Sequence, residues 1–330
     1  MSEGDSRMSA GCDQERVVVT GATGFVGPYL IQQLKSRGFH ITAIAASIPS
    51  NPDPKIQYCE LDIRDAESLR RLIQDCSPTR IYHLAAISEV GLSWSNPRLT
   101  FEVNVLGTYN VFDAAMQLKS PPKVLNISTS QVYASSAIRL NETCLVKPDS
   151  PYSASKAVAE LLTVQYGRIP IGGITTARSF NHCGPGQTPN FFLSSVAKQF
   201  AEMEAGSCPR TLTLGNLTVK RDLTDVRDVV RAYDLLIENG QPWETYNVCS
   251  GVSVSLAEVV HLFQDLVDFE VAIRADPTKV RPNDSEQVCG DPTKIRHHTG
   301  WTPLISLETT VRDTLDYWRS KCRESMSPAL

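Results

Sequence analysis

Short apolar runs alternate with amphipathic stretches over the first 180 residues of the chain. The apolar runs are predicted strands at 16–20, 40–45, 55–62, 80–86, 123–128 and 173–179. They are short, rich in β-branched residues and continuously apolar, as strands covered on both faces are. Helical spacing marks 24–37, 66–76, 97–118 and 153–167. This repeated alternation predicts an α/β fold, a Rossmann-type doubly wound parallel sheet with right-handed crossovers.

The pattern changes after about residue 180. A loop rich in Gly, Pro and Asn at 181–190 is followed by a predicted strand at 211–215 and by predicted helices at 191–205, 226–239, 255–267 and 306–320. We expect a smaller C-terminal α/β substrate-binding domain formed by 179–224 and 250–330. The dinucleotide-binding domain would comprise 15–178 and the returning segment, about 225–249, after a disordered leader at 1–14.

Composition narrows the class of protein. The 330 residues carry 32 Lys and Arg against 36 Asp and Glu, a net charge of −4, and 42% of them are hydrophobic. Such a chain is too apolar to be disordered and too acidic to favour nucleic acid. No apolar run reaches the roughly 18 residues of a membrane span, and the polar N-terminus is unlike a signal peptide. The nine cysteines are scattered, which favours reduced thiols in a cytoplasmic enzyme without a metal site.

A glycine-rich turn follows the first predicted strand. In VVVTGATGFVG, Gly21, Gly24 and Gly27 lie between that strand and the first predicted helix. Glycines there allow a tight turn, close approach of a pyrophosphate to backbone N–H groups, and close helix–strand packing. The helix N-terminus adds partial positive charge. Because strand, glycines and helix come in the required order, the turn predicts a dinucleotide site.

The end of the second predicted strand bears on the choice between NAD(H) and NADP(H). An NAD site usually has a carboxylate there for the ribose 2′-hydroxyl, whereas this chain has Ala45, Ala46 and Ser47. An arginine for a 2′-phosphate is missing too, so the sequence permits either cofactor. Asp62, after the third strand, could contact the adenine or could cap the helix that begins near Ala66.

Tyr152 and Lys156 are four residues apart on a predicted helix, which puts the phenol and the ammonium on one face. A free tyrosine, with a pKa of about 10, exchanges protons poorly at neutral pH. A neighbouring cation stabilises the phenolate. The preceding strand ends in Ser128, Thr129 and Ser130, at the end where α/β sheets bind ligands. With the glycine turn, these residues predict an acid–base site.

These motifs resemble the extended short-chain dehydrogenase/reductases, the group of nucleotide-sugar epimerases and dehydratases. The resemblance spans residues 15–325 and rests on TGATGFVG, LDIRD, HLAA, EVNVLGT, STSQVY and YSASK. It implies that Tyr152 and Lys156 are the catalytic pair, that Thr129 assists them, and that Asn104 has a structural or a proton-relay role. It assigns the nicotinamide cofactor to Gly21, Thr23, Gly24, Phe25, Val26, Gly27, Asp62, Ile63, Leu84, Ala85, Ala86, Tyr152 and Lys156.

The C-terminal half resembles the GDP-sugar enzymes of this group. The likeness is carried by ARSFNHCGPGQ, KRDLTDVRDVVRAY, YNVCSG and RPNDSEQVCGDPTKIRHHTGW. It implies a GDP-sugar substrate, with the arginines on its pyrophosphate, where a planar charged guanidinium suits phosphate oxygens. Each arginine could instead form a surface ion pair, with Asp222 or Asp284. The residues implied for the substrate are Asn181, Asn190, Lys198, Arg221 and Arg281.

One position separates the GDP-mannose 4,6-dehydratases from the related 4-keto-6-deoxy-mannose reductases. By the resemblance, the dehydratases have a Glu two residues after the assisting Thr, and this Glu moves protons during loss of water. The chain has Gln131 there, and an amide cannot act as a base; Glu89 could supply one instead. We therefore expect NAD(P)H-dependent reduction of the C4 ketone of GDP-4-keto-6-deoxy-D-mannose to GDP-D-rhamnose.

Other functions remain open from the sequence. They are a GDP-mannose 4,6-dehydratase, another nucleotide-sugar epimerase, and a non-catalytic nucleotide-sugar binder, which would not need the Tyr152–Lys156 pair. The resemblance also implies a homodimer, formed through helices 97–118 and 153–167.

Overall fold

A seven-stranded sheet organises the larger lobe of the computed structural model, which describes residues 15–135, 139–166, 172–276 and 285–326. All its strand pairs are parallel, which confirms the predicted Rossmann-type α/β fold. The spatial order is β10-β6-β5-β4-β1-β2-β3. In chain order the strands are β1 (Arg16–Thr20), β2 (His40–Ala45), β3 (Gln57–Glu60), β4 (Arg80–His83), β5 (Lys123–Thr129), β6 (Gly173–Ser179) and β10 (Thr245–Val248).

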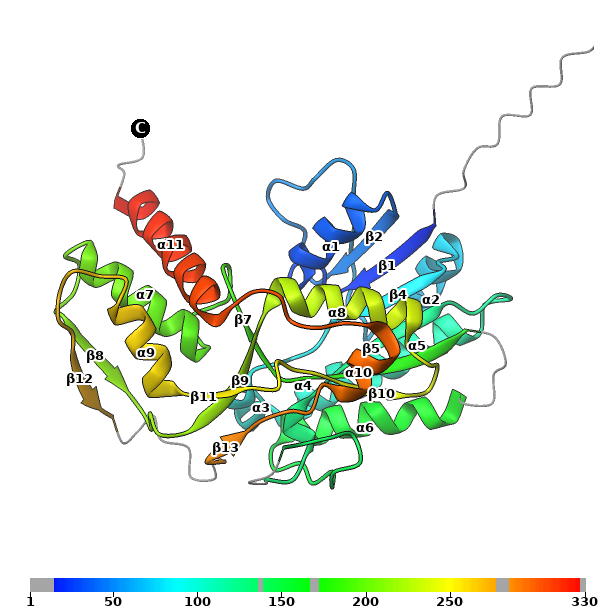
Figure 1. The fold of residues 1–330 in the computed structure, drawn as a ribbon. Coiled ribbons are helices and arrows are strands. Elements are labelled where there is room, and N and C mark those ends of the chain that lie inside the picture. The colour runs from blue at the N-terminus through cyan, green and yellow to red at the C-terminus, as the bar shows by residue number, and fades with distance from the viewer. Residues whose placement is uncertain (1–14, 136–138, 167–171, 277–284, 327–330) are drawn as a thin grey trace, which may run out of the picture.

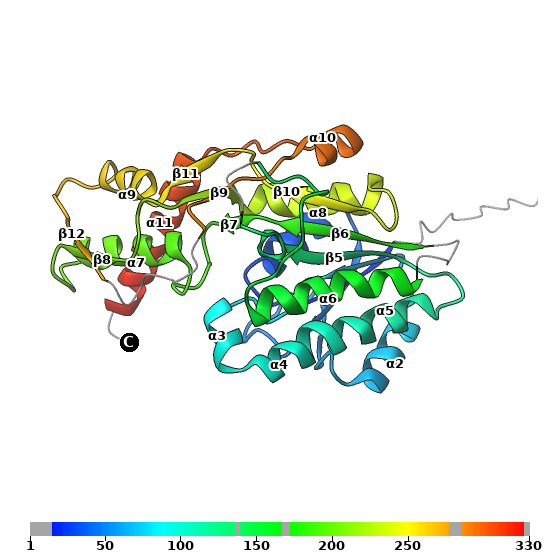
Figure 2. The same ribbon diagram turned by 90° about the horizontal axis from the view of Figure 1, so that it is seen from below.

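Helices cover both faces of this sheet. Figure 2 shows α2 (Ala66–Cys76), α4 (Pro97–Phe101), α5 (Thr108–Met116) and α6 (Pro151–Tyr166) on one side, and α8 (Val226–Asn239) and α10 (Thr293–Thr299) on the other. Helix α1 (Gly27–Ser36) packs with α8. Val19 and Tyr82 belong to the core on the α1/α8 side, whereas their neighbours Val18 and Ile81 belong to the core on the α2/α5 side. Successive strand residues thus enter opposite cores, which explains the uninterrupted apolar runs.

The smaller lobe comes from the C-terminal half (Figure 1). Helices α7 (Phe192–Glu204), α9 (Leu256–Gln264) and α11 (Leu307–Met326) share a core that includes Phe200 and Phe263, beside the paired strands β8 (Thr211–Leu214) and β12 (Ala272–Ala275). A second small sheet joins β7 (Asn181–Cys183), β9 (Lys220–Asp225), β11 (Ser253–Ser255) and β13 (Gln287–Val288). Within the described part of the chain, no helix has the length and apolar character needed to cross a bilayer.

Several elements differ from the sequence prediction. Helix α1 begins at Gly27 rather than at residue 24, because the glycines before it form a turn. The predicted helix 97–118 is interrupted by the π-helical segment η1 (Glu102–Gly107). Asp65 and not Asp62 caps α2, accepting a hydrogen bond from the Ser68 N–H at 3.2 Å.

The π-helical segment holds the buried Asn104 in place. Its side-chain amide donates to the carbonyl oxygen of Ile87 at 3.0 Å and to Ser155 Oγ at 2.9 Å, and its Oδ1 accepts from the Ile87 N–H at 2.8 Å. These bonds join the loop after β4 to helix α6. These contacts give Asn104 a structural role.

Candidate active site

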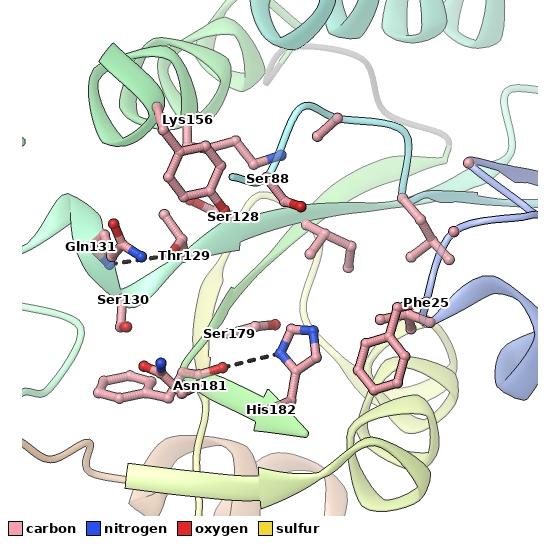
Figure 3. Close-up of a pocket in the computed structure, with 18 of the residues that line it drawn as sticks. Phe25, Ser88, Ser128, Thr129, Ser130, Gln131, Lys156, Ser179, Asn181 and His182 are labelled. Carbon is pink, nitrogen blue, oxygen red and sulfur yellow. Dashed lines mark hydrogen bonds between the residues drawn. The ribbon is translucent and has the colours of Figure 1, made fainter. Parts of the chain in front are cut away.

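The strand order places a crevice between β1 and β4. The chain proceeds outward from β1 through β2 and β3, and in the opposite direction from β4 through β5, β6 and β10. Ligands of open α/β sheets bind at the carboxyl ends of the strands beside such a reversal. A cavity of about 220 Å³ lies there, lined by the glycine turn, by residues after β4, by the ends of β5 and β6, and by α6 (Figure 3).

The glycine turn forms one wall of the cavity, and its glycines serve different purposes. Gly21 has a φ of +66°, and a Cβ there would lie 2.7 Å from the backbone N of Ala85. A Cβ on Gly27 would lie 2.2 Å from the carbonyl oxygen of Ala22, so α1 packs on the turn only without a side chain. Gly24 has more room, since its Cβ would lie 3.3 Å from its nearest neighbour, the carbonyl oxygen of Gly21.

This wall fits the pyrophosphate of a dinucleotide. No described side chain caps the N-terminus of α1, so its first N–H groups are available to an anion. Gly21, Gly24 and Gly27 keep side chains away from the same place. The turn thus offers both the donors and the space that a pyrophosphate needs.

The expected acid–base residues meet in the cavity. Tyr152 and Lys156 in α6 are buried, and both line the cavity with Thr129 from the end of β5. Burial raises the pKa of Tyr152, and a hydrogen bond with Thr129 lowers it. Burial lowers the pKa of Lys156 to about 8, while the charge of Glu160 raises it. At neutral pH the phenol is therefore protonated and most of the ammonium is charged, an arrangement suited to donating a proton beside a cation.

None of the described residues that line the cavity is a carboxylate. Gln131 lies next to Thr129, and its backbone N–H donates to Thr129 Oγ1 at 3.2 Å (Figure 3). Glu89, the alternative base, is not among the lining residues, and its Oε1 accepts from Asn190 Nδ2 at 2.9 Å. The described lining of the cavity therefore offers several hydrogen-bond donors and no carboxylate that could act as a general base.

His182 in β7 is a cavity residue that sequence reasoning did not single out. Its ring is parallel to that of Phe25, with centroids 6.0 Å apart, and its Nδ1 lies 3.1 Å from the carbonyl oxygen of Phe180 (Figure 3). A carbonyl only accepts, so Nδ1 carries the proton and Nε2 of the neutral ring is an acceptor. Burial lowers the pKa of His182, which keeps the ring neutral.

The structure brings most of the expected cofactor and catalytic residues to the cavity. The expected residues that line it are Gly21, Gly24, Phe25, Val26, Gly27, Leu84, Ala86, Thr129, Tyr152, Lys156 and Asn181. Thr23 is exposed beside the turn, and Ala85 contributes the backbone that faces Gly21. Ile63 is buried below Gly107, and the Asp62 carboxylate accepts from Arg64 at 2.6 Å.

Of the other expected substrate residues, Asn190, Lys198 and Arg221 do not line the cavity. Asn190 binds Glu89, and Lys198 Nζ lies 3.6 Å from a Glu202 oxygen within α7. Arg221 in β9 donates from Nη1 to the carbonyl oxygens of Lys220 and Ser285, at 2.8 and 2.9 Å. Arg281 lies outside the described residues.

Asp222, considered above as an ion-pair partner for an arginine, binds backbone N–H groups of neighbouring segments. It is fully buried, and its carboxylate accepts from the N–H groups of Ser250, Gly251 and Gly290 at 2.8 to 3.1 Å. These bonds join β9 to the segments after β10 and β13. Asp222 therefore organises the small sheet.

Some of the missed cavity residues could have been found from the sequence. Ser88 follows β4 and Ser179 ends β6, so the rule that singled out the hydroxyls after β5 applies to them as well. Gln187, Phe191 and Tyr233 reach the cavity from α8 and from the loop before α7. Only tertiary packing brings them there, and no local pattern marks them.

Comparison with known proteins assigns the chain to a family. Its parallel sheet, glycine turn and Tyr–Lys pair have the arrangement of the extended short-chain dehydrogenase/reductases. Within that class, the chain belongs to the GDP-mannose 4,6 dehydratase family, whose model matches residues 18–314.

Three similar proteins illustrate the assignment. GDP-6-deoxy-D-mannose reductase of Pseudomonas aeruginosa is 33% identical over 313 residues, covering 94% of this chain and 99% of that relative. The structure of RMD from Pseudomonas aeruginosa complexed with NADPH matches with a TM-score of 0.81 and 31% identity, over 93% of this chain and 98% of that one. Thermus thermophilus UDP-glucose 4-epimerase in complex with NAD matches with a TM-score of 0.80 and 30% identity, over 92% and 99%. The family resemblance drawn from the motifs is confirmed.

Proposed function

We propose that the protein reduces the C4 ketone of GDP-4-keto-6-deoxy-D-mannose to GDP-D-rhamnose, with NADPH or NADH as the reductant. The observation that carries this proposal is the chemistry of the cavity, where Tyr152 and Thr129 offer hydroxyl groups and residue 131 is an amide. Reduction of a ketone needs a proton donor at the oxygen, whereas loss of water across C5 and C6 also needs a base for the C5 proton. The name of the 33% identical relative supports the same choice.

The cofactor is proposed to lie along the glycine turn, with its pyrophosphate at the N-terminus of α1. Thr23, Phe25 and Val26 would flank it there, and when bound the reduced nicotinamide supplies a hydride. The similar Pseudomonas aeruginosa protein is complexed with NADPH, and the end of β2 offers no carboxylate to repel a 2′-phosphate. On the adenosine side we propose the segments Asp62–Ile63 and Leu84–Ala86.

In the proposed reduction, Tyr152 donates the proton to O4 of the sugar. Its phenol is protonated at neutral pH, and Thr129 presents a second hydroxyl at the same wall. Negative charge that develops on O4 is then met by donors already in place. The ammonium of Lys156 stabilises the phenolate that Tyr152 becomes.

The GDP-sugar is proposed to extend from the cavity toward the smaller lobe. Asn181 lines the cavity, and Asn190 and Lys198 lie beyond it. Arg221 binds the backbone of Ser285, which follows Arg281 closely in the sequence, so we propose that both arginines serve the nucleotide end. In domain terms, the dinucleotide would use 15–178 and about 225–249, and the substrate 179–224 and 250–330.

We also propose a homodimer in the cytoplasm. Exposed apolar side chains occur on α3 (Val90–Ser95), α4, η1 and α6, which pack against one another: Leu92, Trp94, Phe101, Leu106 and Leu161. A contiguous exposed apolar surface favours a protein partner. The proposed location rests on the cysteines within the described residues, all of which are free thiols.

Product identification tests the proposed function. The purified protein is incubated with GDP-4-keto-6-deoxy-D-mannose and with NADPH or NADH, and the sugar product is identified by NMR. We expect one 4-hydroxy product, GDP-D-rhamnose, formed in amounts equal to the cofactor oxidised. An unreduced 4-keto sugar with both cofactors would contradict the proposal.

A further inference from the structure

A buried ionic cluster of Glu160, Arg178 and Ser128 lies beside the acid–base pair. The proposed reduction assigns no role to it. Glu160 is one helical turn beyond Lys156 in α6, and its side chain is 11% exposed. Arg178 in β6 donates to the Glu160 carboxylate with two nitrogens, Nε at 3.0 Å from Oε1 and Nη2 at 2.7 Å from Oε2. Ser128 Oγ donates to Oε1 as well. A buried carboxylate with these three donors is fixed in place.

The neighbours of Arg178 fix the cluster further. The guanidinium lies 4.7 Å from the centre of the Tyr133 ring, and Tyr133 Oη donates to Asn247 Oδ1 at 2.6 Å. Arg178 Nη1 also lies 3.3 Å from the carbonyl oxygen of Glu142. Tyr133 and Glu142, both in the segment between β5 and α6, thus hold the arginine, and the arginine holds Glu160.

The cluster sets the direction of one hydroxyl at the cavity wall. Ser128 lines the cavity, and its hydrogen is committed to Glu160, because an ionised carboxylate only accepts. The remaining lone pairs of Ser128 Oγ are therefore acceptors. Figure 3 shows Ser128 and Lys156 at the same wall of the cavity.

We propose that Glu160 is a positioning residue for the reduction, whose carboxylate keeps Lys156 charged while Arg178 and Ser128 hold that carboxylate in place. The inference rests on the proposed function, since it assigns a purpose to the charge of Lys156. Burial favours loss of the proton from Lys156, and the charge of Glu160 opposes that loss. Without Glu160, burial would act on Lys156 unopposed by this carboxylate.

The other titratable groups named here on the elements around α6 are neutral or are engaged elsewhere. His83 in β4 is neutral, because burial and the nearby Lys156 charge lower its pKa to about 3. Tyr152 is protonated, and Tyr233 of α8 is too, since burial raises its pKa. On α4 and η1, Arg98 and Glu102 pair with each other at the surface, 2.8 Å apart. Asp113 of α5 acts on Tyr166, at the other end of α6.

The test is a titration of Lys156 in the ligand-free protein by NMR, with lysine labelled with ¹³C at Cε and the Lys156 signal identified by its loss in Lys156→Arg. We expect Glu160→Gln to lower the titration midpoint by about one pH unit or more, the scale of a lost neighbouring charge. Arg178→Gln should lower the midpoint as well, because the Glu160 carboxylate loses two of the donors that hold it in place. Glu67→Gln is the matched control, since Glu67 pairs with Arg71 on the surface of α2, and it should leave the midpoint unchanged.

An unchanged midpoint in folded Glu160→Gln would overturn the inference. If that variant does not fold, Arg178→Gln decides, and a midpoint there that is unmoved or raised would overturn the inference. The titration needs no substrate, so a wild-type protein without reductase activity would remove the proposed function and leave this test intact. In the active enzyme, the alkaline limb of kcat/KM should move with the midpoint, which a merely structural role would not cause.

Discussion

At the scale of single residues, the site is defined by charge states that burial sets. A tyrosine free in water and a buried Tyr152 are both protonated at neutral pH, but burial moves Lys156 to a pKa of about 8, close to the working range. The spacing of Tyr152 and Lys156 alone suggested a lowered pKa for Tyr152, but burial raises that pKa. The phenol is therefore suited to give a proton rather than to take one, which agrees with ketone reduction.

Replacing Tyr152 by Phe removes the proposed proton donor and little else. We expect turnover to fall by roughly two to four powers of ten, the usual scale for a lost general acid. GDP-sugar affinity should stay nearly unchanged. Steady-state oxidation of NADPH measures the first quantity and calorimetry the second. Tyr58→Phe, in β3 and outside the cavity lining, is the control. Wild-type turnover in Tyr152→Phe would mean that another group supplies the proton.

At the scale of elements, the glycine turn and the strand ends carry the site. The sequence predicted the first six strands because all but the edge strand β3 are mostly buried and apolar, and their alternation with helices specifies a parallel sheet. It did not predict α3, α10, β7, β9, β11, β12 and β13, which have between two and seven residues and are too short to show a period. Ser88 and Ser179 could have been predicted because they follow or end predicted strands. Phe191 and Tyr233 reach the cavity only through tertiary packing, which no local pattern marks.

Gly24 provides the cleanest test of the glycine turn. A valine there should fold, because a Cβ at this position lies at 3.3 Å from its nearest neighbour, whereas one at Gly21 would lie at 2.7 Å from backbone. The valine would project into the place assigned to the pyrophosphate, so we expect cofactor binding to be lost. Fluorescence titration with NADPH measures this, and the melting temperature checks the fold.

Gly91→Val, in α3 with open space around it, is the control for Gly24→Val and should bind NADPH as the wild type does. Unchanged NADPH affinity in folded Gly24→Val would remove the dinucleotide site from this turn.

At the scale of the whole molecule, the cavity joins the two lobes. Its lining comes from the parallel sheet and α6 on one side, and from β7 and the loop before α7 on the other. The proposed dimer would use a different surface of the larger lobe, formed by α3, α4, η1 and α6. The cavity proposed for cofactor and substrate and the surface proposed for the partner are thus separate, although α6 contributes to both.

Charged substitutions on that surface test the dimer. Leu106 and Leu161 are 57% and 68% exposed, and Leu106→Glu with Leu161→Glu would bury two carboxylates in the proposed interface, which is unfavourable. In analytical ultracentrifugation we expect the wild type to sediment as a dimer and the double variant as a monomer. Leu304→Glu, 72% exposed outside these helices, is the control. A wild-type monomer, or a double variant that stays dimeric, would contradict the proposal.

The measurement that decides most directly between reduction and dehydration compares two substrates under the same conditions. The protein is given GDP-mannose or GDP-4-keto-6-deoxy-D-mannose with NADPH and with NADH, and cofactor oxidation and sugar product are followed together. Because Gln131 cannot act as a base, we expect oxidation of one cofactor per ketone reduced with the keto sugar, and little or no change in GDP-mannose. Efficient conversion of GDP-mannose to the 4-keto-6-deoxy sugar, without net change in the cofactor, would contradict the reductase assignment.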